Sequence, residues 1–310
     1  MPDYSEYILI KNEQLTFHNH YRGDYTFLCD VFWGEQEAKR IISKQVSAEE
    51  FKGDNPFTRI IIDEDRKDVH LQIEIPEYKN GAGILTLKKY LELLQANWDG
   101  WSVKHLENGY YDVMRLLARY DQFGAKRSID RILDYVPAFL KQVWDEPQGT
   151  LLSRNNGKTV EYGYLAENVA PVIAEQEGLL DRKLENFIPT DRLPHGGIHI
   201  DQKAKKIQVW YTITPYNFEK WVQSYWPNWE VTFDFWGFEN HYKLLKVEKE
   251  LKVIENSLQQ QTNRYLTDHI VNNDREPYFD FADRTYKFKE RERTKQWRKE
   301  KFEELWKKCE

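Results

Sequence analysis

The stretch SYWPNWEVTFDFWGFENHYKLL, residues 224–245, decides the fold, because the earlier stretch ANWDGWSVKHLENGYYDVMRLL, residues 96–117, follows the same plan. Both contain two tryptophans three positions apart, then a valine, a glycine and a final pair of leucines. The equivalent positions are Trp98 and Trp226, Trp101 and Trp229, Val103 and Val231, Gly109 and Gly237, and Leu117 and Leu245. This ordered agreement indicates that one structural unit occurs twice in the chain.

The similarity extends upstream into a pair of predicted strands. Residues 60–75, IIIDEDRKDVHLQIEI, match residues 198–213, IHIDQKAKKIQVWYTI, so that Asp63 aligns with Asp201. In each segment apolar residues alternate with polar ones on both sides of a polar tip, which is the pattern of a β-hairpin. Because aspartate side chains bond nearby backbone in turns, we expect Asp63 and Asp201 to shape these tips.

A helix, a third strand and a second helix are predicted next in each repeat. Apolar residues at i, i+3, i+4 and i+7 indicate the first helix. They are Leu87, Tyr90, Leu91 and Leu94 in the first repeat and Phe218, Trp221, Val222 and Tyr225 in the second. The apolar period then changes to two, as in a strand, until the glycine. We predict an α+β fold of two tandem β-β-α-β-α-type repeats, with mostly antiparallel sheets and the helices on one face, followed by C-terminal helices.

The tryptophans of the repeated stretch are expected to have two different roles. The first two in each copy lie where helix meets strand, so we predict that they join the two layers inside the core. Trp236 has Asn108 as its counterpart, so the fold does not require a ring at this position. We therefore place Trp236 on the outer surface, together with Asp234 and Glu239, as candidate partner-binding residues.

Four regions follow from these patterns. Residues 1–120 form a first α+β repeat, 121–148 a helical connection, 149–246 a second α+β repeat and 247–310 a charged helical extension. The extension has only four apolar anchors in its last helix, which are Trp297, Phe302, Leu305 and Trp306. Mixed charges at helical spacing are typical of a solvated helix face. The alternative is an arm that holds a partner or a second copy of the chain, which would give a homodimer through the C-terminal helices.

The composition limits the class of protein. The chain has 310 residues, a net charge of −6, 15% aromatic residues and two cysteines, Cys29 and Cys309. An acidic balance argues against nucleic acid as the main partner. Two distant cysteines provide neither a disulfide framework nor a zinc site. We find no secretory signal and no apolar run long enough to cross a bilayer, so we expect a cytoplasmic protein without a membrane contact.

Only one segment suggests chemistry. LPHGGIHID places His195, His199 and Asp201 near one another, and on a helix this spacing could hold a metal. The adjacent glycines oppose a helix, so His199 and Asp201 are expected on one face of a strand and His195 on the loop before it. We assign no metal, no cofactor and no catalytic residue. The three residues remain an alternative site, for a hydrolase acting between the repeats.

The tract I-x-I-D … W-P-x-W-x-V … G resembles uncharacterised, often duplicated bacterial proteins associated with toxin immunity. Its residues here are Ile198, Asp201, Trp226, Pro227, Trp229, Val231 and Gly237. The resemblance, together with an acidic, aromatic-rich and motif-free sequence, suggests a non-enzymatic immunity or inhibitor protein that occludes a toxin or effector. A phage or mobile-element protein that blocks a host complex would work by the same occlusion, and the sequence does not separate the two.

Overall fold

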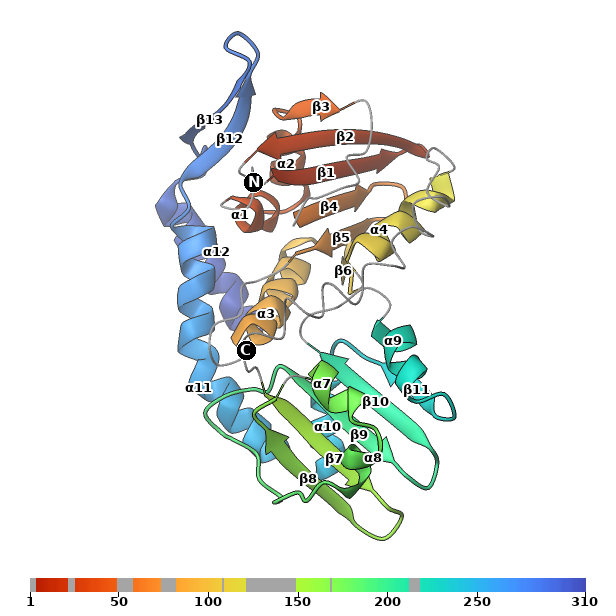
Figure 1. Ribbon diagram of the computed structural model, residues 1–310. Helices are drawn as coiled ribbons and strands as arrows, with labels where there is room; N and C mark the ends of the chain where they lie inside the picture. Colours follow the sequence, from red (N-terminus) through yellow and green to blue (C-terminus); the bar gives the residue numbers. More distant parts are fainter. Residues whose placement is uncertain are drawn as a thin grey trace.

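The chain forms an α+β structure with two mixed sheets, as Figure 1 shows. The computed structural model describes residues 4–21, 26–48, 58–73, 82–107, 109–120, 149–167, 169–211 and 218–310. The first sheet lies above the second in Figure 1; one C-terminal helix runs along one side of both sheets, and the other lies beside the first. The predicted helical connection, 121–148, lies outside the described residues.

The first sheet has the strand order β3-β2-β1-β4-β5-β6. Its strands are β1 (Tyr4–Lys11), β2 (Gln14–Tyr21), β3 (Val46–Ala48), β4 (Thr58–Asp63), β5 (Asp68–Gln72) and β6 (Ser102–His105). The pairs β1–β4 and β5–β6 are parallel, and the pairs β1–β2, β2–β3 and β4–β5 are antiparallel.

The second sheet has the order β11-β10-β9-β7-β8. Its strands are β7 (Thr150–Asn155), β8 (Val160–Leu165), β9 (Gly196–Asp201), β10 (Lys206–Tyr211) and β11 (Glu230–Phe233). The pairs β7–β9 and β10–β11 are parallel, and β7–β8 and β9–β10 are antiparallel. Both sheets are therefore mixed, and in the described strands five antiparallel pairs only slightly outnumber four parallel ones, in contrast to the predicted mostly antiparallel sheets.

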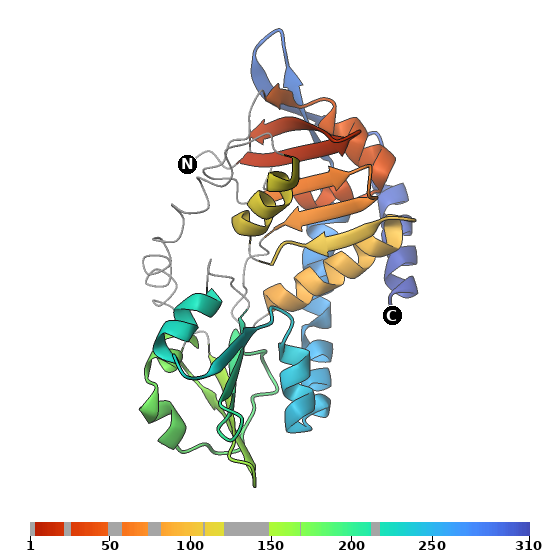
Figure 2. The same ribbon diagram turned by 90° about the vertical axis from the view of Figure 1, so that its right-hand side faces the viewer.

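Helices cover both faces of each sheet, and not one face as predicted. The helices of the first region are α1 (Phe27–Phe32), α2 (Glu35–Ile42), α3 (Ala82–Asn97) and α4 (Tyr110–Leu117), and those of the second are α7 (Val169–Ala174), α8 (Glu177–Asp181), α9 (Phe218–Tyr225) and α10 (Phe238–Leu245). In the first region α4 lies across the sheet from α1 and α3, as Figure 2 shows, and in the second α10 lies across the sheet from α7 and α9. The reason is visible in β4, where Ile60, Ile61 and Ile62 are all fully buried. A continuous apolar run, in contrast to an alternating one, requires cover on both sides.

The two tryptophan pairs make equivalent contacts. Trp98 Nε1 donates to the carbonyl of Val31 in α1 at 2.9 Å, and Trp226 Nε1 donates to the carbonyl of Ile173 in α7 at 3.0 Å. In each stretch the second tryptophan ring lies across the first, with ring centroids 5.2 Å apart. Each indole thus links the end of the helix that precedes it, α3 or α9, to another helix on the same face of its sheet.

The C-terminal region is not entirely helical. It consists of α11 (Glu248–Leu266), a π-helical turn η3 (Thr267–Val271), the hairpin strands β12 (Arg275–Asp280) and β13 (Thr285–Glu290), and α12 (Lys295–Lys308). The predicted helical extension is therefore interrupted by a two-stranded sheet. In α12 the predicted anchors Phe302, Leu305 and Trp306 are buried, and so is Arg298.

One continuous hydrophobic core runs through both regions. It includes Tyr90 of α3, Leu258 of α11 and Phe302 of α12, and it reaches Tyr242 on α10. Separate clusters lie under α4 and between the second sheet and α7 and α9. The C-terminal helices therefore pack within the chain, against α3 and α10. In the described part of the chain, every helix is too short or too polar to cross a membrane.

We predict that Trp226→Phe lowers the free energy of unfolding by about 2–4 kcal/mol, because the Ile173 carbonyl loses its donor and the smaller ring leaves a void. Urea unfolding measures the change. Trp229→Phe is the matched control, since Trp229 is only half-buried and makes no such helix-to-helix bond. An equal loss in both variants would contradict the role assigned to the indole N–H.

Candidate functional site

The β12–β13 hairpin, residues 275–290, projects from the body of the molecule, and we call it the arm (Figures 1 and 2). Its strands pair so that Phe279 faces Tyr286 and Pro277 faces Phe288, which places these four side chains on one face. Glu276 and Lys289 are opposite each other on the other face. The arm is thus an amphipathic ribbon.

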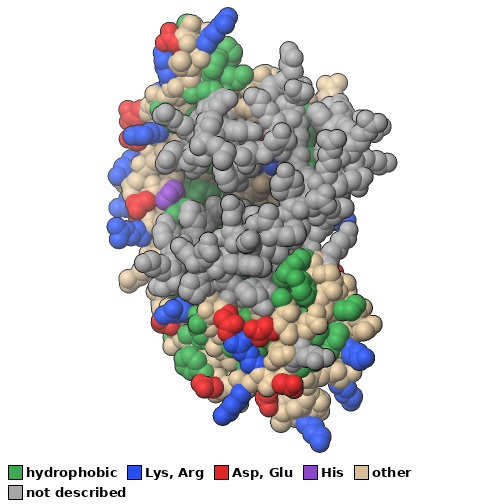
Figure 3. All heavy atoms as spheres, in the orientation of Figure 1, with side chains coloured by type: hydrophobic (Ala, Val, Ile, Leu, Met, Phe, Trp, Pro, Cys, Tyr) green, Lys and Arg blue, Asp and Glu red, His purple; other side chains and the backbone are tan. Residues whose placement is uncertain are grey.

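The tip of the arm carries an exposed aromatic ring. Asp280 Oδ1 accepts the backbone N–H groups of Ala282 and Asp283, and Arg284 has a φ of 52°, so the turn is tightly defined. Phe281 is 71% exposed, the most of any large hydrophobic residue in the described ranges. Its ring packs edge-on against the ring of Phe279, with the ring centroids 5.0 Å apart, and this contact fixes the direction of the Phe281 side chain. In the space-filling view hydrophobic side chains show on this part of the surface, at upper left (Figure 3).

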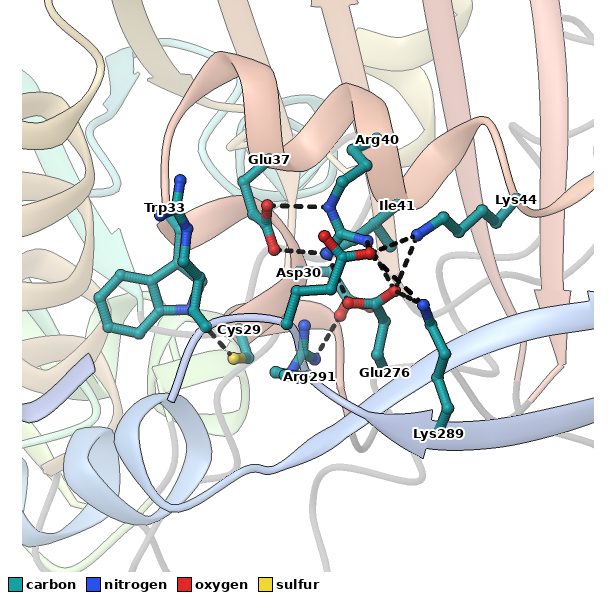
Figure 4. Close-up of polar contacts among 12 residues, drawn as sticks. Cys29, Asp30, Trp33, Glu37, Arg40, Ile41, Lys44, Glu276, Lys289 and Arg291 are labelled. Carbon is teal, nitrogen blue, oxygen red and sulfur yellow. Dashed lines mark hydrogen bonds and ion pairs between the residues drawn. The ribbon is translucent and has the colours of Figure 1, made fainter. Parts of the chain in front are cut away.

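A buried carboxylate holds the base of the arm (Figure 4). Glu276 is completely buried, and it accepts from Arg40 and Lys44 of the α2 region and from Lys289 of β13. Burial alone would raise the pKa of Glu276, but the hydrogen bonds from Arg40, Lys44 and Lys289 outweigh it and lower the pKa to about 2. The carboxylate therefore stays charged in the folded protein.

A second buried ion pair lies where the arm leads into α12. Arg291 Nη2 donates to Asp30 of α1 at 2.5 Å, and both side chains are almost fully buried. Tyr7 and Thr26 also donate to the Asp30 carboxylate, at 3.0 and 2.8 Å. The neighbouring Cys29 is buried, and burial raises the pKa of its thiol to about 11, so it is not a nucleophile at neutral pH.

Backbone contacts complete the attachment. Phe279 N donates to the carbonyl of Lys44 at 3.0 Å, and Gln45 Nε2 donates to the carbonyl of Pro277 at 3.0 Å. Tyr286 Oη donates to the carbonyl of Asn19 on β2 at 2.5 Å. The base of the arm is thus fixed to the first sheet and α2 on several sides, and only the tip extends freely.

The arm was missed in the sequence, although a signal was present. The segment PYFDF–ADR–TYKFK alternates in polarity on both sides of a polar turn, which favours a hairpin. Its first half looks like a turn-rich break, and its second half runs into RERTKQWRKEKFEEL, whose charges have helical spacing, so that this second half looks helical. The turn also lacks the glycine or proline that normally marks a hairpin.

The predicted partner-binding residues lie at the junction of the two sheets. Trp236 is half-buried, and its ring lies 6.2 Å from that of His105 in the first region. Glu239 is exposed and forms an ion pair with Lys88 of α3. Asp234 is exposed and accepts the backbone N–H of Trp236 at 3.0 Å. Trp236 is therefore partly covered by the first region, and partner binding by the three residues remains a prediction.

The residues of the alternative site do not form an open centre. His195, just before β9, and His199, on β9, are 7% and 6% exposed. His199 Nδ1 is 2.8 Å from Ser153 Oγ of β7, a completely buried hydroxyl. Asp201 accepts the backbone N–H of Ala204, as expected for a residue that shapes a turn. Among the described residues no three His, Cys, Asp or Glu side chains are arranged to hold a metal ion.

No protein-family model, curated protein or solved structure matches this chain, so the candidate site is argued from its own geometry.

We predict that Glu276→Gln lowers the free energy of unfolding by about 2 kcal/mol at pH 7, because the buried carboxylate loses its charge-assisted hydrogen bonds from Arg40, Lys44 and Lys289, while these cations, 22–40% exposed, stay partly solvated. The depressed pKa also sets a pH dependence. The stabilisation is complete above pH 4.5, the ordinary value, and is lost as the pH falls toward 2.

Urea unfolding between pH 7 and pH 3 tests both points. Glu292→Gln is the matched control, since Glu292 contacts the same three cations but is 54% exposed. We expect little effect there. If Glu276→Gln keeps the stability and the acid sensitivity of the parent, the buried carboxylate does not hold the arm.

Proposed function

We propose that this chain is a cytoplasmic, non-enzymatic protein-binding protein that grips its partner through the arm. We further propose that it acts as an immunity or inhibitor protein, which occludes a toxin or effector. The observation that carries the proposal is Phe281, a large apolar ring held 71% exposed at the tip of a ribbon whose base is fixed by buried ion pairs.

The energetics favour such an anchor. Burying a phenylalanine side chain in a partner's pocket contributes about 1.5–3 kcal/mol. Interfaces commonly depend on a few anchors of this kind. Because Phe279 already orients the Phe281 ring and the turn is internally hydrogen bonded, little conformational entropy remains to be lost on binding.

The charge of the chain bears on the partner. A net charge of −6 attracts a basic protein at long range and increases its association rate. Inhibition by occlusion requires only a complementary surface of ordinary size and no chemistry on the inhibitor's side. This fits a chain in which the histidines and aspartates of the alternative site are buried or used in turns.

We also propose that the two α+β regions are copies of one module. The strand orders β2-β1-β4-β5-β6 and β8-β7-β9-β10-β11 have the same sequence of parallel and antiparallel pairs. The indole-to-carbonyl bonds of Trp98 and Trp226 support the same conclusion.

Two alternatives differ in what they require. A phage or mobile-element protein that blocks a host complex would use the arm in the same way, and only the identity of the partner separates it. A hydrolase acting near His195, His199 and Asp201 would require the buried Ser153 and His199 to become accessible to substrate. A homodimer would require the arm, or the C-terminal helices, to contact a second copy.

We predict that Phe281→Ser weakens partner binding by about 10- to 150-fold, the equivalent of the transfer free energy of one phenylalanine ring. Affinity capture from the native host, with the parent chain as bait, identifies the partner. Titration calorimetry with the purified partner then measures the affinity of each variant.

Phe187→Ser is the matched control, because Phe187 is 57% exposed and lies in the second region, away from the arm. We expect it to bind as the parent does. The parent, but not Phe281→Ser, should also inhibit the partner's activity at equal concentrations. An affinity that is unchanged in Phe281→Ser would rule out the arm, and self-association that depends on Phe281 would replace the foreign partner with a second copy.

A further inference from the structure

A continuous chain of hydrogen-bonded side chains lies between the second sheet and α10. Trp210 Nε1 is 2.9 Å from His241 Nδ1, His241 Nε2 is 2.6 Å from Ser153 Oγ, and Ser153 Oγ is 2.8 Å from His199 Nδ1. The four side chains come from β10, α10, β7 and β9. Each is at most 6% exposed, so water does not compete for these bonds.

The direction of the first two hydrogen bonds in this chain is fixed. An indole N–H can only donate, so His241 Nδ1 must accept from Trp210 and its proton must lie on Nε2. His241 Nε2 then donates to Ser153 Oγ, and the Ser153 hydroxyl donates to His199 Nδ1. The bonds from Trp210 to His241 and from His241 to Ser153 are satisfied together only while His241 is neutral.

We propose that Trp210, His241, Ser153 and His199 form an acid-sensitive latch, which holds α10 on the second sheet and is broken by a proton on His241. A proton on His241 Nδ1 would place two donors, the imidazolium and the indole, against each other. A proton on His199 Nδ1 would only reverse its bond with Ser153, because the Ser153 hydroxyl has two lone pairs and can accept from both imidazoles.

The surroundings offer little compensation for such a charge. The titratable group beside His241 is His199, and Asp201 at the end of β9 is the carboxylate that acts on His199. Ser153 on β7 and Trp210 on β10 do not titrate in this range. On α10 itself Glu239 and Lys243 are exposed, and Glu250 on α11 acts on the neighbouring Tyr242.

The titration follows from burial. Burial, and next the proximity of His199, lowers the pKa of His241 to about 3. Burial also lowers the pKa of His199, and Asp201 opposes that effect. The latch therefore stabilises the docked state fully above pH 6.5, the ordinary value, and is progressively lost as the pH falls toward 3.

The packing at the latch leaves no room for adjustment. A side chain at Gly197 would lie 2.2 Å from Trp210 Nε1 and 2.7 Å from His241 Nδ1, so only glycine allows the indole and the imidazole to meet over β9. The latch also acts at a distance. Helix α10 leads directly into α11, which packs on α3 of the first region, so release of α10 loosens the connection between the two regions.

Hydrogen exchange measured by mass spectrometry tests the latch, with protection factors corrected for the intrinsic rate at each pH. Between pH 7.0 and pH 4.5 we expect the protection of the α10 amides to fall about tenfold or more. The limit for one imidazole is about 100-fold, because pH 4.5 lies two units below the ordinary pKa. In His241→Gln, which offers a donor and an acceptor but does not titrate, we expect a change of less than about twofold.

Two further variants keep the test decisive. His70→Gln is the matched control, since His70 is also buried, with its pKa lowered to about 4, but lies on β5 of the first region. It should lose α10 protection as the parent does. His241→Asn, which does not titrate and keeps an acceptor for the Trp210 indole, replaces His241→Gln if that variant lacks the parent's near-UV circular dichroism at pH 7. The latch is refuted if α10 protection in the parent is the same at both pH values, or if the folded latch variants lose it as the parent does.

Discussion

The burial of one face of α11 is the constraint on which the rest of the structure depends. Leu251, Ile254 and Leu258 recur at a spacing of three and four, and the same face continues to Leu266. This face packs on α3 of the first region and on α10 of the second, so that both share one core. The direction of α11 also determines where the chain turns into the arm. Without this packing of α11, the two sheets and the arm would have no fixed positions relative to one another.

Much of the fold is predictable because it depends on local patterns. The spacing of apolar and polar residues alone predicts the hairpin at Asp201, the apolar stripe of α9 and the tryptophans at the helix ends. The cover on both faces is harder to see. The consecutive residues Ile60 to Ile62 indicate that β4 is covered on both faces. Strand β9, with Gly197 and His199 on the face toward α10, looks half polar in the sequence. That face of β9 can be buried because its polar side chains are hydrogen bonded to one another. The spacing of residues in the sequence does not predict such hydrogen bonds.

The candidate site was less predictable, for two physical reasons. The arm is held by partners that are far away in the sequence, since Glu276 meets Arg40 at a separation of 236 residues. Nothing near position 276 shows that its charge will be neutralised. Trp236 misled in another way. A position that differs between two similar stretches is not necessarily fully exposed, because the two regions also contact each other, and the Trp236 ring lies near His105 in that contact.

The pairing of Asp30 with Arg291 has a consequence for how the chain is made. These residues are 261 positions apart, and at roughly 5–20 residues per second the ribosome delivers the arginine ~15–50 s after the aspartate. During that interval the nascent α1 segment has a carboxylate whose buried position lacks its cation. The buried site around Asp30 therefore stays incomplete until Arg291 has been synthesised and has left the ribosome.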